Sequence, residues 1–146
     1  MAVFNKLNGF VEHLSKGVHD FSSHQLTLAL SNLAPSSETA PPSGSTSDCI
    51  LANVTQISYS GLSSRNVTTN SAIQTAGTFR LVLADLTLSA TASVGPFRYI
   101  YLYNATATSP VAPLIGYFDY GASLTLANGE SLTIDFDQAS GALTLA

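Results

Sequence analysis

The stretch from Val94 to Tyr120, VGPFRYIYLYNATATSPVAPLIGYFDY, decides the fold that this sequence predicts. It holds five of the six tyrosines of the chain. Two runs within it, FRYIYLY and PLIGYFDY, are rich in aromatic and large apolar residues and are bounded by glycine and proline, which is typical of β-strands. We therefore expect two strands, joined by the polar, proline-containing connection NATATSPVA.

The residues that follow this stretch predict more strands. The runs SLTLA and SLTIDF alternate apolar and polar residues, and the Asn128-Gly129 pair between them favours a type I′ turn. This pattern predicts a β-hairpin. The final run ALTLA predicts a last strand, and we expect the C-terminus to be paired in a sheet.

The residues that precede the stretch extend the β pattern. HQLTLALS, residues 24–31, alternates as a half-buried strand does. Residues 67–75 and 78–89 also predict strands, and a change of phase at Asp85 indicates a bulge or a strand broken in two. Residues 49–58 fit a short helix or a strand. Seven or eight short strands predict a mainly β fold, an antiparallel β-sandwich or jelly-roll-like barrel.

One N-terminal α-helix is expected over residues 3–21, since the apolar residues there recur at helical spacing. We considered two roles for it, packing over a sheet or docking into a neighbouring subunit. We expect the β-sandwich at about residues 49–146 and a single structural domain over residues 1–146. The helical stripe consists of Phe4, Leu7, Phe10, Val11, Leu14, Val18 and Phe21.

A long loop is predicted over residues 32–48, NLAPSSETAPPSGSTSD. It contains three prolines, one glycine and many Ser and Thr residues, and it has no apolar period. Loops of this length without secondary structure are uncommon in compact domains. We expect either an arm that reaches across a surface or a disordered insertion.

Charge is scarce in this chain. Charged residues make up 10% of it, against about 25% in an average soluble domain. A surface of small neutral polar groups costs little to desolvate, which suits packing within a protein assembly. The net charge is −4, and the five basic residues form no run, so no direct nucleic-acid binding is expected. We find no secretory signal and no apolar run that predicts a membrane span.

The titratable clusters do not predict a metal site or catalysis. His13 and His19 are six residues apart and would not share a helix face, so with His24 they read as solvated histidines rather than zinc ligands. Asp135 and Asp137 lie two apart on an expected strand and would share a face. They fit a calcium site, given a third oxygen ligand, or a solvated sheet face.

Three further residues are expected to be structural. Arg98 and Asp119 would form an ion pair if the two aromatic strands pair, and a catalytic acid would need a second group and a cleft. Cys49, the single cysteine, lies beside apolar residues and is expected to be buried and unreactive. Since no catalytic or nucleotide-binding motif is present, we predict no enzyme, no catalytic residues, no cofactor and no metal.

The order of these segments resembles a family of small bacteriophage virion structural proteins, most like capsid decoration (cement) proteins. The segments that carry the resemblance are FNKLNGFVEHLSKGVHDF, HQLTLALSNLAP, SAIQTAGTFRLVLADLTLSATASVGPFRYIYLYN, PLIGYFDYG and SLTLANGESLTIDFDQASGALTLA.

The resemblance implies a protein made in the host cytoplasm and located on the capsid exterior of the virion. Its partners would be copies of itself, most often as a homotrimer, and the phage major capsid protein. A neck, tail or fibre component is the competing possibility, and a fibre module would bind a host receptor or carbohydrate.

For such a protein the interface residues would come from the apolar helix face and from the aromatic strands, since aromatic residues are enriched at interface centres. The candidates are Phe4, Leu7, Phe10, Tyr99, Tyr101, Tyr103 and Tyr117.

Overall fold

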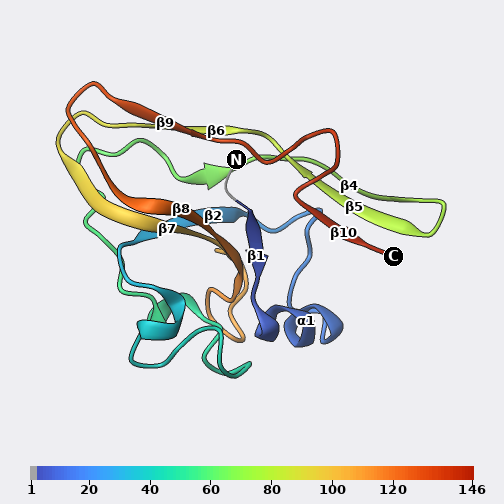
Figure 1. Cartoon of the computed structure of the whole chain (residues 1–146). Coiled ribbons are helices and arrows are strands. Elements are labelled where there is room, and N and C mark those ends of the chain that lie inside the picture. The colour runs from blue at the N-terminus through green and yellow to red at the C-terminus, as the bar shows by residue number, and fades with distance from the viewer. Residues whose placement is uncertain (1–2) are drawn as a thin grey trace.

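The structure is a computed structural model that describes residues 3–146, and it is mainly β, with antiparallel sheets and one N-terminal helix (Figure 1). This confirms the expected fold class, a sandwich-like β fold with one helix. The larger sheet has five strands in the order β1-β8-β7-β2-β3. Their bounds are β1 Phe4–Lys6, β8 Leu114–Leu126, β7 Val94–Asn104, β2 Leu26–Ser31 and β3 Asn66–Val67.

Two smaller sheets form the second layer, which Figure 1 shows above the larger sheet. One has the order β10-β5-β4, and the other pairs β6 with β9. An apolar core lies between the layers, because alternate side chains of each strand point inward. The bounds are β4 Thr69–Thr75, β5 Thr78–Leu83, β6 Leu86–Ser89, β9 Ser131–Ile134 and β10 Leu143–Leu145.

The pairing of β7 with β8 confirms that the two aromatic runs form adjacent antiparallel strands. Ile100 faces Phe118, and Tyr101 faces Tyr117. Because neighbouring residues of a strand point to opposite faces, Ile100 and Phe118 enter the core between the layers. Tyr101 enters a second apolar cluster on the opposite face of the sheet.

The expected long loop covers this tyrosine face. It contains the short 3-10 helix η1 (Pro35–Ser37), and a second one, η2 (Leu51–Asn53), follows it. Figure 1 shows both on the side of the larger sheet that faces away from β6 and β9. Glu38 is buried there and accepts hydrogen bonds from the N–H and the hydroxyl of Thr55, at 2.8 and 2.7 Å. The segment therefore reaches across a surface, as one of the two alternatives had it, and that surface is a face of its own sheet.

The expected helix of residues 3–21 is shorter in the structure. The helix α1 spans Asn8–Ser15, and β1 precedes it. Gly17 ends the helix with φ of 73°. The N–H groups of Gly17 and Val18 donate to the carbonyls of Leu14 and His13, at 3.1 and 2.9 Å. This is a Schellman cap, which glycine favours because it adopts a left-handed conformation at little cost.

Other boundaries also differ from expectation. The run 78–89 is broken in two, as one of the two alternatives had it, and β5 and β6 lie in different sheets. The expected hairpin between SLTLA and SLTIDF is wrong, because β8 pairs with β7 and β9 pairs with β6. Residues 127–130 turn tightly and carry the chain from one layer to the other. The terminal strand β10 pairs with β5, as expected.

No helix within residues 3–146 is long and apolar enough to cross a membrane.

Candidate functional site

Five of the seven expected interface residues are buried, and the other two are partly buried. Leu7, Phe10 and Tyr101 are at most 2% exposed. Tyr99 and Tyr103 are also buried, and Phe4 and Tyr117 are partly buried. The segment around η1 and η2 lies against the larger sheet (Figure 1) and packs in one apolar cluster with the four tyrosines and Leu7, whereas Phe10, with Phe4 against it, belongs to the core between the layers.

The structure therefore corrects the sequence-based choice of interface residues. The alternation of a strand shows which side chains share a face, but it does not show that a loop of the same chain covers that face. The five buried side chains stabilise the fold, and in this conformation they are not accessible to a partner.

The three histidines lie together, and two of them are buried, so the expectation of solvated histidines is wrong. His13 and His19 are 4% and 7% exposed, and their ring centroids are 6.1 Å apart. The ring of His19 also stacks on Phe21, with centroids 5.6 Å apart. Asn104 reaches them from the end of β7, and its Nδ2 lies 2.8 Å from Nδ1 of His24 and 3.3 Å from Nδ1 of His19.

Burial controls the charge of this histidine cluster. Burial, with smaller contributions from the neighbouring His13 and His24, lowers the pKa of His19 to about 4. Burial also lowers the pKa of His13. Both rings are therefore neutral near pH 7. Within the part of the chain that the structure describes, no three His, Cys, Asp or Glu side chains are arranged as a metal site.

Asp135 and Asp137 do not share a strand face, which corrects the expectation. The strand β9 ends at Ile134, and Asp137 adopts φ of 46° in the turn that follows. Asp135 Oδ1 accepts the N–H of Asp137 at 2.8 Å, and Asp137 Oδ1 accepts the N–H of Ser140 at 3.1 Å. The two carboxylates thus stabilise the turn by bonding to its backbone.

The expected structural roles of Arg98, Asp119 and Cys49 agree with the geometry. Arg98 and Asp119 form a two-point ion pair between β7 and β8. Cys49 is fully buried beneath α1, and burial raises the pKa of its thiol to about 11. A thiol that stays protonated near neutral pH is a poor nucleophile.

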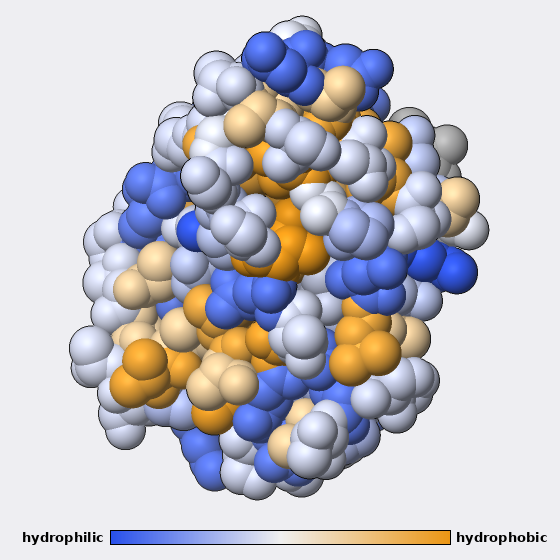
Figure 2. Space-filling view, turned by 90° about the vertical axis from the view of Figure 1, so that its left-hand side faces the viewer, coloured by the Kyte–Doolittle hydropathy of each residue, from blue (hydrophilic) through white to orange (hydrophobic). Residues whose placement is uncertain are grey.

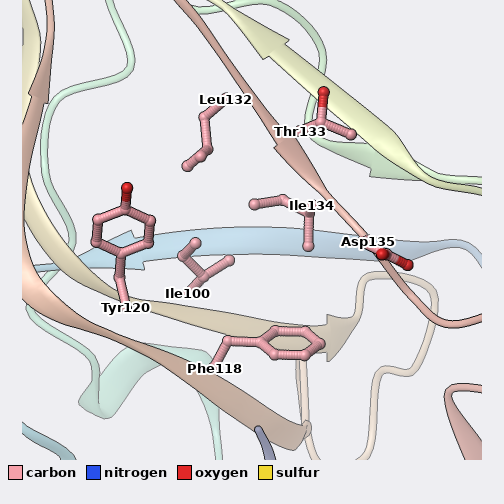
Figure 3. A pocket seen from close by; sticks show the side chains of 7 residues that line it. All are labelled: Ile100, Phe118, Tyr120, Leu132, Thr133, Ile134 and Asp135. Atoms are coloured by element: carbon pink, nitrogen blue, oxygen red, sulfur yellow. The ribbon is translucent and has the colours of Figure 1, made fainter. Parts of the chain in front are cut away.

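A cavity at the open side of the sandwich, between β8 and β9, is the best candidate for a functional site. Its volume is about 260 Å³. Figure 3 shows Leu132 and Ile134 projecting from β9 into the space above Ile100, while Phe118 and Tyr120 rise from β8 on the other side. The lining residues are Ile100, Phe118, Tyr120, Leu132, Thr133, Ile134 and Asp135.

The chemistry of this cavity is mainly apolar, with polar groups at its edges. The Tyr120 residue is 48% exposed, so its ring can be reached from solvent. Among the described residues that line the cavity, Asp135 alone carries a charge. The hydroxyl of Thr133 points away from the cavity and lies 2.9 Å from the hydroxyl of Thr87. The arrangement can bind an apolar group and a neighbouring cation.

Sequence reasoning missed this site because its two walls come from strands in different sheets. Phe118 and Tyr120 lie two residues apart, as do Leu132 and Ile134, so the members of each pair share a strand face. The erroneous hairpin would have placed these two strands side by side in one sheet, and no cavity would then separate them.

Comparison with protein-family models, with curated proteins and with solved structures finds no match for this chain.

Proposed function

We propose that this chain is a non-enzymatic structural component of a bacteriophage virion, and specifically a decoration (cement) protein on the capsid exterior. It would be made in the host cytoplasm, assemble with copies of itself as a homotrimer, and bind the major capsid protein. The proposal rests on the resemblance in the order of sequence segments and on the chemistry of the surface.

The observation that carries the proposal is the apolar cavity at the open side of a fold with very little charge. Only 10% of the residues are charged, and the cavity wall contains one charged side chain among the described residues. Figure 2 shows several apolar patches that reach the surface between polar residues. Such a surface loses little hydration energy when a protein partner covers it.

The mechanism follows from mass action. A protein that binds the assembled shell, and not its separated subunits, stabilises the shell by the free energy of binding at every occupied site. Because the contributions of many copies add, the stabilisation of the shell by each single copy can be small. Because the tyrosines of β7 are buried, the proposed contacts with the shell come from exposed residues such as Tyr120, Val111 and Val3.

The test is to count copies of the chain in purified particles by quantitative mass spectrometry, with the major capsid protein as internal standard. Hundreds of copies per particle are expected for a shell protein, since copy number follows the symmetry of the assembly. About a dozen copies would place the chain in the neck or tail. Native mass spectrometry of the isolated chain tests the homotrimer, and a monomer at micromolar concentration would contradict it.

A second candidate is a fibre or tail component that binds carbohydrate on the host. The exposed ring of Tyr120 and the carboxylate of Asp135 line the same cavity, and aromatic rings with nearby polar groups suit sugar binding. A glycan array separates the two candidates, because a decoration protein would show no selective binding on it.

A further inference from the structure

The two-stranded sheet of β6 and β9 has one edge that no described strand covers. On its other edge, β6 is covered by residues 61–63, since Leu62 bridges to Ala90 and Ser63 N–H donates to the Ser89 carbonyl at 2.9 Å. Within residues 3–146, β9 pairs with β6 alone. Its outer backbone groups are therefore available to another strand.

The cavity lies directly beneath this free edge. Leu132 and Ile134 of β9 point into it, with Ile100 and Phe118 opposite (Figure 3). A strand added beside β9 would alternate its side chains in the same way, so every second side chain would point toward the cavity. The bound strand would then extend the small sheet over Phe118 and Tyr120.

The carboxylate of Asp135 favours a bound strand that carries a basic residue. Asp135 stands at the end of β9 and uses Oδ1 to accept the N–H of Asp137, while Oδ2 has no hydrogen-bond partner among the described residues. The described lining contains no basic residue that would neutralise it. A lysine or arginine of the bound segment would therefore complement this carboxylate.

We propose that the outer edge of β9 binds an extended peptide segment of a partner protein, with one apolar side chain in the cavity and a basic residue at Asp135. The free strand edge favours a peptide over a sugar or a docked helix, because only an extended backbone matches its donors and acceptors. This proposal rests on the proposed function in one respect, which is that the partner would be a shell protein.

The test is selection of a displayed library of random nine-residue peptides against the full-length chain. We expect enriched sequences with apolar residues at alternate positions, followed within two residues by Lys or Arg. The enriched peptide is then titrated by fluorescence polarisation, and the amide signals of Leu132, Ile134 and Asp135 are followed by NMR.

Matched variants identify the site. Tyr120→Ala removes an exposed cavity wall and is expected to weaken the peptide about tenfold. Asp135→Asn is expected to weaken it about threefold, and to have no effect on a peptide whose basic residue is replaced by Gln. Asp137→Asn is the control, since its carboxylate lies outside the cavity lining, and it should bind as the parent chain does. NMR of each variant without peptide verifies that it is folded.

Three outcomes would overturn the proposal. The first is a selection that yields no consensus of apolar and basic residues. The second is that the selected peptides bind Tyr120→Ala and Asp135→Asn with the same affinity as the parent chain. The third is that saccharides, but not the selected peptides, shift the NMR signals of the cavity residues. None of these results depends on phage particles. Failure of this proposal therefore leaves the copy-number test of the proposed function intact, and the reverse also holds.

Discussion

Arg98 and Asp119 form a two-point ion pair that joins β7 to β8. Arg98 Nε lies 2.7 Å from Asp119 Oδ1, and Arg98 Nη2 lies 2.8 Å from Asp119 Oδ2. Asp119 Oδ1 also accepts the N–H of Gly121 at 2.8 Å, at a point where Gly121 has φ of 89°. The hydrogen bond to Arg98 lowers the pKa of Asp119 and raises that of Arg98. The carboxylate thus serves both strand pairing and a local bend.

Replacement of Asp119 is expected to cost more stability than replacement of Arg98. Asp119→Ala removes the ion pair and the acceptor of the Gly121 N–H, and it should lower the free energy of unfolding by about 1 kcal/mol. Arg98→Ala leaves the Gly121 bond in place, and a partly exposed pair contributes little by itself. Urea unfolding of both variants measures which of them loses more free energy of unfolding. Equal losses in the two variants would show that the bond to Gly121 contributes nothing.

Tyr101→Phe is expected to preserve or increase stability. The Tyr101 residue is fully buried, and its hydroxyl has no hydrogen-bond partner among the described residues. Burial and the nearby Glu38 raise the pKa of this hydroxyl. Removal of an unsatisfied buried hydroxyl should leave the free energy of unfolding unchanged or raise it by about 1 kcal/mol.

Tyr101→Ala is the matched variant, and it should lower the free energy of unfolding by about 3–5 kcal/mol, because it leaves a cavity. Tyr120→Ala, at an exposed ring, should change it by less than about 1 kcal/mol. Thermal unfolding followed by circular dichroism compares the three. A Tyr101→Ala protein as stable as the parent would contradict the buried position of this ring.

Gly9→Ala is expected to destabilise the chain, although alanine normally favours a helix by about 1 kcal/mol over glycine. A Cβ atom at Gly9 would lie 2.5 Å from Cys49 Cβ and 3.0 Å from Thr46 Cα. The helix would have to move away from the segment that it contacts, at a cost of about 1–3 kcal/mol. Asn8→Ala, at an exposed position of the same helix, is the control. A gain in stability in both variants would argue against close packing at Gly9.

Stability is expected to fall in mild acid because of the buried histidines. The pKa of His19 is lowered from 6.5 to about 4. Between these values the unfolded chain binds more protons than the folded one, so the free energy of unfolding decreases as the pH falls. The loss attributable to His19 should reach about 3 kcal/mol near pH 4.

Chemical unfolding at several pH values measures this loss in the parent chain and in His19→Gln. The variant should show a flatter dependence between pH 6.5 and 4, with a remainder from His13, whose pKa is also lowered. The pKa of Asp20 is lowered to about 2, so this carboxyl contributes to the pH dependence of the free energy of unfolding below this range. Parallel curves for parent and variant would show that His19 is not buried in a neutral form.

The local sequence pattern was sufficient to predict the positions of most strands, but it did not predict the contacts between residues that are distant in the chain. The runs FRYIYLY and PLIGYFDY predicted β7 and β8, and the apolar period around Phe10 predicted α1 but not its bounds, Asn8–Ser15. The Asn128-Gly129 pair predicted a turn but assigned the wrong strand partners. A turn signal acts over four residues, whereas strand partners depend on how the two layers close around their core.

The amino-acid order alone determined that this chain is mainly β, that FRYIYLY and PLIGYFDY form strands, and that Arg98 and Asp119 would pair if those two strands were neighbours. These properties follow from a two-residue period and from neighbouring strands. Tertiary structure alone decided which face the loop of residues 32–48 covers, how Asn104 and the histidines meet, and where the cavity beside β9 opens. Such contacts join residues far apart in the chain, and their positions are set by packing, which no local pattern records.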